Sequence, residues 1–281
     1  MKTIAFFSIK GGTGRSLALA NVAAYFVTKG KRVGCVDFDI MAPGLLSIFN
    51  VPDEISLQKA SVIDMLINLD NIEILPNSII DCGEFIGLPK NRLFLLPAKT
   101  EPKKKYQELA KSDAFNVGTM NIFKTRFLDP FCGIKELDYF FIDARSGLAE
   151  ESLCALSLAK KHILLFTRLD TQSINVTLHF IELLNQYRYR LKPVIVASNV
   201  PEGDVEFVID ENRFKINEQA FEIINRTNQA LKKFDVQINS IIPFDETLLL
   251  EHKILIMNHP DNPASKGFIL LAKIIEKLEE D

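Results

Sequence analysis

The chain has 281 residues, of which 47% are hydrophobic, and its formal net charge is −3 at pH 7. This length fits one large α/β domain with enough apolar residues for a core on both faces of a sheet. The small net charge gives no general indication of nucleic-acid binding. No apolar run approaches the ~18 residues of a membrane-spanning helix, and no signal peptide precedes the first strand, so we expect a cytoplasmic protein.

The first predicted elements are a buried strand at 2–8 and a helix at 15–29, joined by a glycine-rich turn. This turn reads Lys10-Gly11-Gly12-Thr13-Gly14-Arg15-Ser16-Leu17. Glycines let backbone N–H groups close around an anion, and the helix N-terminus adds a partial positive charge. A hydroxyl at the position of Ser16 suits a magnesium ion. The turn therefore predicts a phosphate-binding loop whose residues 11–17 contact a nucleotide.

The loop departs from the usual pattern G-x-x-x-x-G-K-[ST], because Ile9 and Arg15 replace its first glycine and its lysine. A dinucleotide-binding fingerprint is the alternative, since an acid, Asp37, follows Gly12-x-Gly14 after about twenty residues. That fingerprint needs a third glycine where the chain has Leu17, and it gives the lysine and the hydroxyl of the turn no role. We therefore favour the phosphate-binding loop.

Two further strands are predicted to end in carboxylates. The strand at 32–37 leads to Asp37 and Asp39, which strand alternation places on one side of the chain. The strand at 138–143 ends in Asp143 and resembles a Walker B strand. Open parallel sheets bind ligands at the carboxyl ends of their strands. Acids there suit a hydrated magnesium ion and a water nucleophile, and solvated strand-end acids are the alternative.

Alternation of strands and helices continues along the chain. Besides those above, we expect strands at 71–75, 92–97, 162–167, 193–199 and 237–242, and a long loop at 76–90. We expect helices at 57–69, 103–113, 150–160, 171–188, 213–234 and 264–279. This order predicts a mostly parallel central sheet with helices on both faces. We expect a single domain over 1–281, with embellishments at about 46–130 and 202–234.

These motifs together resemble the ParA/MinD family of P-loop ATPases, whose members dimerise around ATP. The loop fits the deviant pattern K-G-G-x-G-K-[ST] of that family except at Arg15. The resemblance implies that Lys10 reaches the nucleotide of a dimer partner and that Asp39 positions the attacking water. The implied magnesium ligands are Ser16, Asp37 and Asp143.

Later motifs also resemble this family. The strand at 193–199 ends in Asn199, whose amide suits an adenine edge, although Asn is common where strands end. Ile241-Ile242-Pro243-Phe244-Asp245 resembles the family's I-P-x-D turn, in which Pro243 and Asp245 flank the base. The turn after the Walker B-like strand contains Arg145, which either contacts phosphate or a dimer partner or forms an ordinary salt bridge.

The resemblance implies an ATP- and Mg²⁺-dependent dimerisation switch in partitioning, positioning or regulation. Arginine is longer than lysine and planar, so Arg15 predicts slow hydrolysis. The alternative is a nucleotide-sensing regulator or scaffold with little or no ATPase activity. A metabolic ligase of this fold would need a substrate pocket that the sequence does not reveal. A tyrosine kinase would need a tyrosine-rich tail, and no tyrosine follows Tyr189.

The expected partners are a second copy of the chain, bound when ATP is bound, and an unidentified protein partner or activator. Basic clusters at 103–105, which opens a helix, and at 188–192, which closes one, make DNA a lesser alternative. A helix C-terminus favours cations without any ligand, which explains the second cluster equally well. The last helix ends in Glu279-Glu280-Asp281, so packing on the sheet is favoured over membrane binding. The cysteines are scattered without a C-x-x-C pair, which predicts free thiols rather than a zinc or iron–sulfur site.

Overall fold

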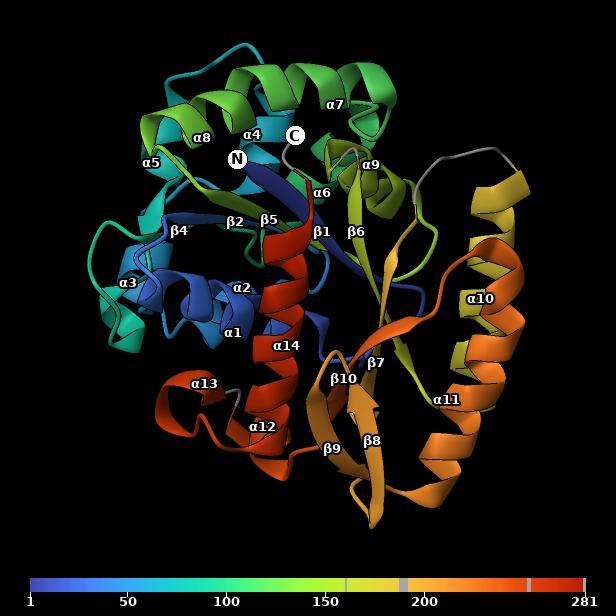
Figure 1. Cartoon of the computed structure of the whole chain (residues 1–281). Coiled ribbons are helices and arrows are strands. Elements are labelled where there is room, and N and C mark those ends of the chain that lie inside the picture. Colours follow the sequence, from blue (N-terminus) through green and yellow to red (C-terminus); the bar gives the residue numbers. More distant parts are fainter. Residues whose placement is uncertain (160, 187–191, 252–253, 280–281) are drawn as a thin grey trace.

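The computed structural model of the chain describes residues 1–159, 161–186, 192–251 and 254–279. Its strands are β1 Lys2–Ser8, β2 Val33–Phe38, β3 Ile80–Asp81, β4 Leu93–Leu96, β5 Tyr139–Ala144, β6 His162–Arg168, β7 Val194–Val200, β8 Val205–Ile209, β9 Asn212–Ile216 and β10 Ile238–Pro243. Within these residues, eight strands form a central sheet in the order β10-β7-β6-β1-β5-β2-β4-β3 (Figure 1). Neighbouring strands of this sheet are parallel, except that β3 is antiparallel to β4.

Helices cover both faces of the sheet. Their bounds are α1 Arg15–Thr28, α2 Leu45–Ile48, α3 Asp53–Ser56, α4 Val62–Ile67, α5 Ile74–Ser78, α6 Lys103–Lys111, α7 Val117–Phe123, α8 Asp129–Ile134, α9 Glu150–Ala159, α10 Thr171–Gln186, α11 Glu218–Leu231, α12 Glu246–Glu251, α13 Leu255–Asn258 and α14 Pro263–Lys277. Short 3₁₀ or π turns occur at η1 Glu84–Ile86, η2 Lys124–Leu128 and η3 Lys232–Phe234.

Each face of the sheet has its own apolar core. In β1, Ile4 and Phe6 pack into one core and Ala5 and Phe7 into the other, because successive side chains of a strand alternate. The first core includes residues of α1, α2, α13 and α14, and α1 and α14 contact each other on this face of the sheet (Figure 1). The second core includes residues of α4 to α11. The predicted α/β fold, a mostly parallel sheet between two helical layers, is confirmed.

Most predicted elements agree with the structure. The strands expected at 2–8, 32–37, 92–97, 138–143, 162–167, 193–199 and 237–242 are found within a residue of their predicted bounds. The last helix buries Phe268, Leu271 and Ile275 against β10 and α1, which confirms the prediction that it packs on the sheet. The basic cluster at 103–105 opens α6 as expected. Of the second cluster, residues 188–191 lie outside the described part of the chain.

The strand expected at 71–75 is wrong, because α5 begins at Ile74. The Asn71 side chain accepts a hydrogen bond from the backbone N–H of Glu73, which turns the chain there. The helix expected at 57–69 is shorter, since Ser61 and Asp64 form a capping box that starts α4 at Val62. The loop expected at 76–90 contains β3 and η1.

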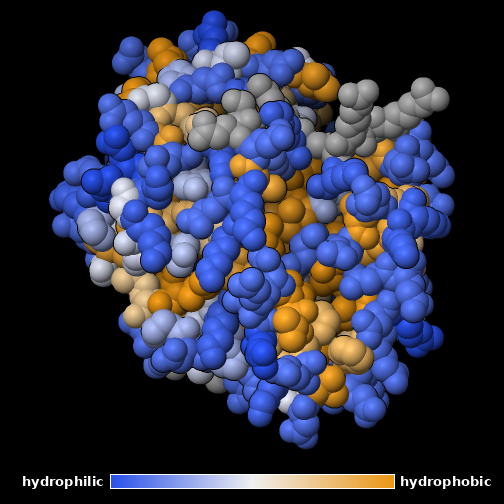
Figure 2. Space-filling view, viewed as in Figure 1, coloured by the Kyte–Doolittle hydropathy of each residue, from blue (hydrophilic) through white to orange (hydrophobic). Residues whose placement is uncertain are grey.

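The helix expected at 213–234 is wrong in its first turn, where the chain forms the β8–β9 hairpin. Asp210 and Glu211 have φ of 44° and 67°, the left-handed pair of a tight hairpin turn. Asn217 then caps α11 by accepting the backbone N–H of Gln219. Figure 2 shows apolar side chains gathered over this hairpin, where Val208 is 55% exposed. The helices of residues 117–134 were not predicted either.

Among the residues that the structure describes, no helix is both long and apolar enough to cross a bilayer.

Candidate nucleotide site

The glycine-rich turn lies where β1 ends, at the carboxyl edge of the sheet, and opens onto a cavity of about 620 Å³. Gly12 and Gly14 have φ of 72° and 69°, a left-handed backbone that glycine adopts without strain. Gly14 occupies the cap position of α1, so the cavity lies at the N-terminus of a long helix. This arrangement is well suited to an anion.

Residues from four separate segments meet at this cavity. The loop residues Gly11, Gly12, Thr13, Gly14, Arg15, Ser16 and Leu17 line it together with Asp39, Asn199 and Asp245. Four other predicted site residues are not among its lining residues, namely Lys10, Asp37, Asp143 and Pro243. The sequence therefore predicted a set of residues of which most lie around one cavity.

Arg15 is bound to two carboxylates and a hydroxyl. Its side chain is 8% exposed, and its Nε donates a hydrogen bond of 2.8 Å to Oδ1 of Asp143. Nη2 donates to Oδ2 of Asp39 at 3.1 Å, and Nη1 donates to Oγ of Ser8 at 3.1 Å. Sequence reasoning missed Ser8, whose signal is a hydroxyl at the last strand position before the loop. All three donor nitrogens of the guanidinium are thus engaged inside the protein.

Asp37 holds the backbone of the loop that follows β2. It lies opposite Asp143 in the register of β2 and β5, and it is fully buried. Its carboxylate accepts the backbone N–H groups of Asp39, Gly44 and Leu45, each at 3.1 Å. Burial, together with the charge of Asp143, raises the pKa of Asp37 well above its usual range, and the backbone donors oppose this shift.

The oxygen atoms at the site can be compared with the ligands that the implied magnesium ion requires. Oδ1 of Asp39 and Oδ2 of Asp143 are buried and have no hydrogen-bond partner among the described atoms. Unsatisfied carboxylate oxygens of this kind fit a hydrated divalent cation, and Ser16, which lines the cavity, is the hydroxyl-bearing residue of the implied ligand set. Both oxygens of Asp37 accept backbone N–H groups, so it fits this cation less well.

Asp39 is the most accessible of the three acids, with a side chain 14% exposed. Burial raises its pKa, and the nearby guanidinium of Arg15 opposes that shift. Arg15 therefore stabilises the ionised form of Asp39, which is the form that can accept a proton or orient a water molecule.

Comparisons with known proteins agree with this geometry. A ParA family model, described as NUBPL iron-transfer P-loop NTPase, matches residues 1–78. An uncharacterised ATP-binding protein of Methanocaldococcus jannaschii is 35% identical over 82 residues, which make up 27% of this chain and 31% of that protein. An iron–sulfur cluster carrier protein of Saccharolobus solfataricus is 22% identical over 294 residues, with 99% of this chain and 83% of the relative covered.

Among solved structures, the septum site-determining protein MinD of Pyrococcus horikoshii, complexed with Mg-ADP, has a TM-score of 0.67 at 19% identity. The alignment covers 98% of this chain and 96% of that one. The resemblance to the ParA/MinD family is confirmed. At this identity the structural likeness establishes the P-loop NTPase fold, and the family match lies over the N-terminal segment that contains the phosphate-binding loop.

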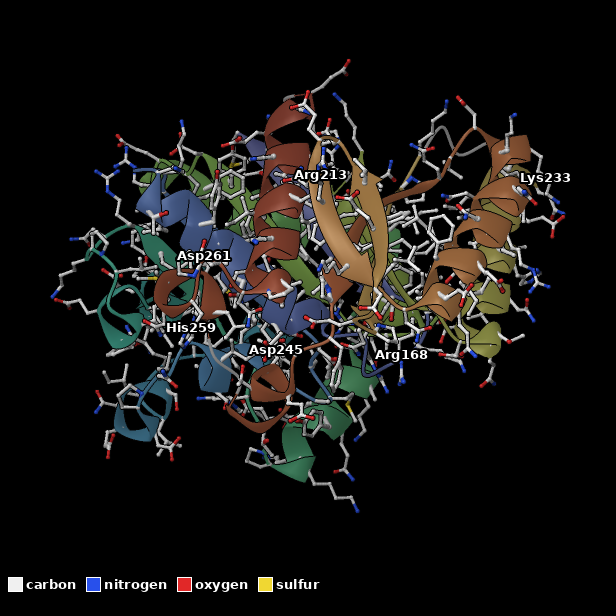
Figure 3. All side chains as sticks on the ribbon, turned by 60° about the horizontal axis from the view of Figure 1, so that its bottom comes forward. Arg168, Arg213, Lys233, Asp245, His259 and Asp261 are labelled. Carbon is white, nitrogen blue, oxygen red and sulfur yellow. The ribbon has the colours of Figure 1, made fainter. Side chains whose placement is uncertain are left out.

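In this ParA/MinD-like chain, Lys10 lies on the rim of the sheet's carboxyl edge. The pKa of Asp170, which follows β6, is lowered. Burial raises this pKa, but hydrogen bonds from Ser173 and the charges of Lys10 and Arg168 lower it by more. Lys10 is therefore close to the end of β6 rather than among the residues lining its own cavity. Figure 3, in which this edge is turned forward, labels Arg168 and Asp245 near it.

The remaining predicted residues make contacts within the segments around the cavity. Asn199 has φ of 54° and donates from Nδ2 to the carbonyl of Gly12 at 3.3 Å, which connects β7 to the loop. Asp245 accepts the backbone N–H of Thr247 at 2.8 Å and caps the turn after Pro243. Of the two alternatives for Arg145, the structure contains a salt bridge, 2.7 Å from its Nη1 to Oε2 of Glu151.

Proposed function

We propose that this chain is an ATP-binding, slowly hydrolysing ParA/MinD-like ATPase that acts as a nucleotide-dependent dimerisation switch in partitioning, positioning or regulation. The observation that carries the proposal is the cavity at the carboxyl edge of the sheet. Its lining combines the phosphate-binding loop with Asp39, and with Asn199 and Asp245, the residues proposed to lie beside the nucleotide base.

Each group has a distinct role in this proposal. Loop residues 11–17 and the N-terminus of α1 bind the phosphates. Asn199, Pro243 and Asp245 flank the base. Ser16 and Asp143 hold Mg²⁺, and Asp37 supports them by fixing the loop after β2. The bound ion neutralises charge on the phosphate oxygens, and the Mg-ADP complex of the structurally similar MinD supports its inclusion.

The switch needs one step in which ATP binding causes dimerisation and a second step in which hydrolysis reverses it. Asp39 orients the attacking water, since its carboxylate lines the cavity and has an unpartnered oxygen. Lys10 closes the dimer by contacting the nucleotide of the partner, which suits a lysine that does not line its own cavity. A symmetric contact of this kind is isologous, so nucleotide binding and association are coupled.

A regulator or scaffold with little or no ATPase activity is the second candidate. The contacts of Arg15 favour it, because a guanidinium engaged by Asp39, Asp143 and Ser8 is not free to act as the phosphate-binding lysine does. Both candidates share nucleotide binding, and they differ in the rate of hydrolysis.

In this proposal the chain does not carry an iron–sulfur cluster, unlike the carrier protein to which it is similar. Free cysteines occur at four separate places, all buried: Cys35, Cys82, Cys132 and Cys154. Burial raises the pKa of Cys132 to about 12, so its thiol is protonated and a poor metal ligand. Described residues contain no group of three or more metal-ligating side chains. A protein partner is the favoured cargo, with DNA as the lesser alternative.

Sedimentation of the purified protein without nucleotide, with ADP and with ATP plus Mg²⁺ tests this proposal, together with phosphate release from the same sample. We expect a dimer only with ATP and slow release. Lys10→Ala should abolish that dimer, whereas Lys103→Ala, at an exposed lysine of α6, serves as the matched control. A species that nucleotide does not change would refute the switch.

A further inference from the structure

We infer that the contacts of Arg15 form a lock, which phosphate opens. The guanidinium of Arg15 joins Asp39 to Asp143, and on nucleotide binding its Nη2 passes from Asp39 to a phosphate oxygen. Asp39 is then released and can orient water. This inference rests on the nucleotide binding proposed above and assigns positioning roles to Arg15 and Ser8.

The starting state of the lock is set by three contacts. Nε, Nη1 and Nη2 of Arg15 each have a different acceptor, on Asp143, Ser8 and Asp39. A guanidinium is planar, so these acceptors fix its orientation as well as its position. A lysine ammonium has one nitrogen and cannot join the same three groups in this geometry. The arrangement therefore depends on arginine.

The two carboxylates hold the guanidinium unequally. The contact to Asp143 is 2.8 Å long and its carboxylate is 1% exposed, whereas the contact to Asp39 is 3.1 Å long and its carboxylate is 14% exposed. Electrostatic attraction weakens as solvent approaches the pair. The bond from Nη2 to Asp39 is thus the one that an incoming anion replaces, while Nε stays on Asp143.

The cavity lies next to this bond, so an anion bound there would be close to Nη2. Arg15 and Asp39 both line it, beside the loop and helix N-terminus that suit phosphate. Phosphate oxygens accept two parallel N–H bonds from a guanidinium and carry more charge than one carboxylate. Nη2 carries two N–H groups, so phosphate and Asp39 compete for the position of this nitrogen rather than for a single N–H, and a phosphate that draws Nη2 toward the loop lengthens its bond to Asp39.

Release changes what Asp39 can do. In the locked state Oδ2 is bonded to Arg15, and only Oδ1 has no partner. Release frees Oδ2 as a second acceptor for a water molecule. Hydrolysis competence then increases with phosphate binding, because Oδ2 is bonded to Arg15 until phosphate draws the guanidinium away.

A lock lowers the apparent affinity for nucleotide, because part of the binding free energy is used to open it. Asp39→Asn removes the charge that competes with phosphate and should tighten binding. A charge-assisted hydrogen bond of this kind is worth roughly a factor of ten in affinity. We expect the β,γ-imido analogue of ATP to bind Asp39→Asn about tenfold more tightly than the natural chain.

A double-mutant cycle separates the lock from simple charge repulsion. Affinities for the same analogue are measured by calorimetry at one fixed Mg²⁺ concentration, for Asp39→Asn in the natural chain and in an Arg15→Gln background. With Arg15 absent there is no lock to open, so the same substitution should change affinity less than about twofold. If Arg15→Gln does not fold, Arg15→Lys provides the second background.

Asp138→Asn is the matched control, since it makes the same charge change at the opposite end of β5. It should leave affinity unchanged. Equal tightening in both Arg15 backgrounds would show that Asp39 only repels nucleotide, and unchanged or weaker binding by Asp39→Asn would also overturn the lock. If the natural chain binds no analogue at all, the proposed function fails as well, which distinguishes that failure from the loss of the lock alone.

Discussion

Replacing Arg15 by methionine tests how strongly the fold depends on its guanidinium. Methionine keeps most of the side-chain volume, so the change removes charge and hydrogen bonds rather than opening a cavity. Removing one partner of a buried ion pair costs about 3–5 kcal/mol. The carboxylate of Asp143 is 1% exposed and that of Asp39 is 14% exposed, so partial solvation places our expectation near the lower limit, at about 3 kcal/mol.

Differential scanning calorimetry measures this loss directly. For a chain of this size, about 3 kcal/mol corresponds to a fall in Tm of roughly 6–12 °C. Arg168→Met is the matched control: its side chain is 52% exposed, and the nearest carboxylate oxygen, on Asp170, is 3.9 Å from Nε. Exposed pairs contribute about 0–1 kcal/mol, so this control should lose less than about 4 °C. Equal losses in the two variants would refute a stabilising role for the Arg15 contacts.

The same variant should respond to pH in a defined direction. Burial raises the pKa of Asp39 and Arg15 opposes that shift, so the folded variant has a higher Asp39 pKa than the natural chain. Between those two pKa values the folded variant binds more protons. The stability difference from the natural chain therefore increases as pH rises and shrinks as pH falls. A difference that grows on acidification would contradict this assignment.

Three further substitutions have defined outcomes. Gly34→Ala should lower the free energy of unfolding by about 1–3 kcal/mol in urea titrations, because its Cβ would lie 2.3 Å from Cδ1 of Leu137 and 2.9 Å from Cε1 of Phe131. Asn199→Gly keeps the left-handed backbone and loses only the amide, so it should weaken ATP binding as much as Asn199→Ala does in calorimetry; unchanged binding would exclude the base contact. Arg15→Lys should raise phosphate release severalfold in a turnover assay, and an unchanged rate would show that Arg15 does not limit hydrolysis.

The sequence predicted the carboxyl edge of the sheet well because its signals there are local. Gly12 and Gly14 lie in one turn and report a backbone that few other residues adopt. Asp39 and Asp143 each follow a short apolar run, and parallel strands bring such positions to one edge. Local pattern and tertiary placement therefore agree at these residues.

The contacts that join distant segments could not be predicted in the same way. Nothing near Ser8 or Asp39 in the sequence indicates that one guanidinium bonds to both. The β8–β9 turn was missed because Asp210 and Glu211 adopt left-handed backbone without the Asn-Gly or Asp-Gly sequence typical of such turns. In both places the outcome depends on packing across the fold rather than on neighbouring residues.

The crowding of acids explains why an arginine is suited to this loop. Asp37 and Asp143 face each other on adjacent strands, and Asp39 lies two residues beyond the first. Asp37 accepts three backbone N–H groups, whereas Arg15 donates to both Asp39 and Asp143. One guanidinium compensates both acids, which stabilises the fold and makes the same cation less available to phosphate. Stability without nucleotide and affinity for nucleotide are therefore opposed through Arg15, so a substitution that improves one should reduce the other.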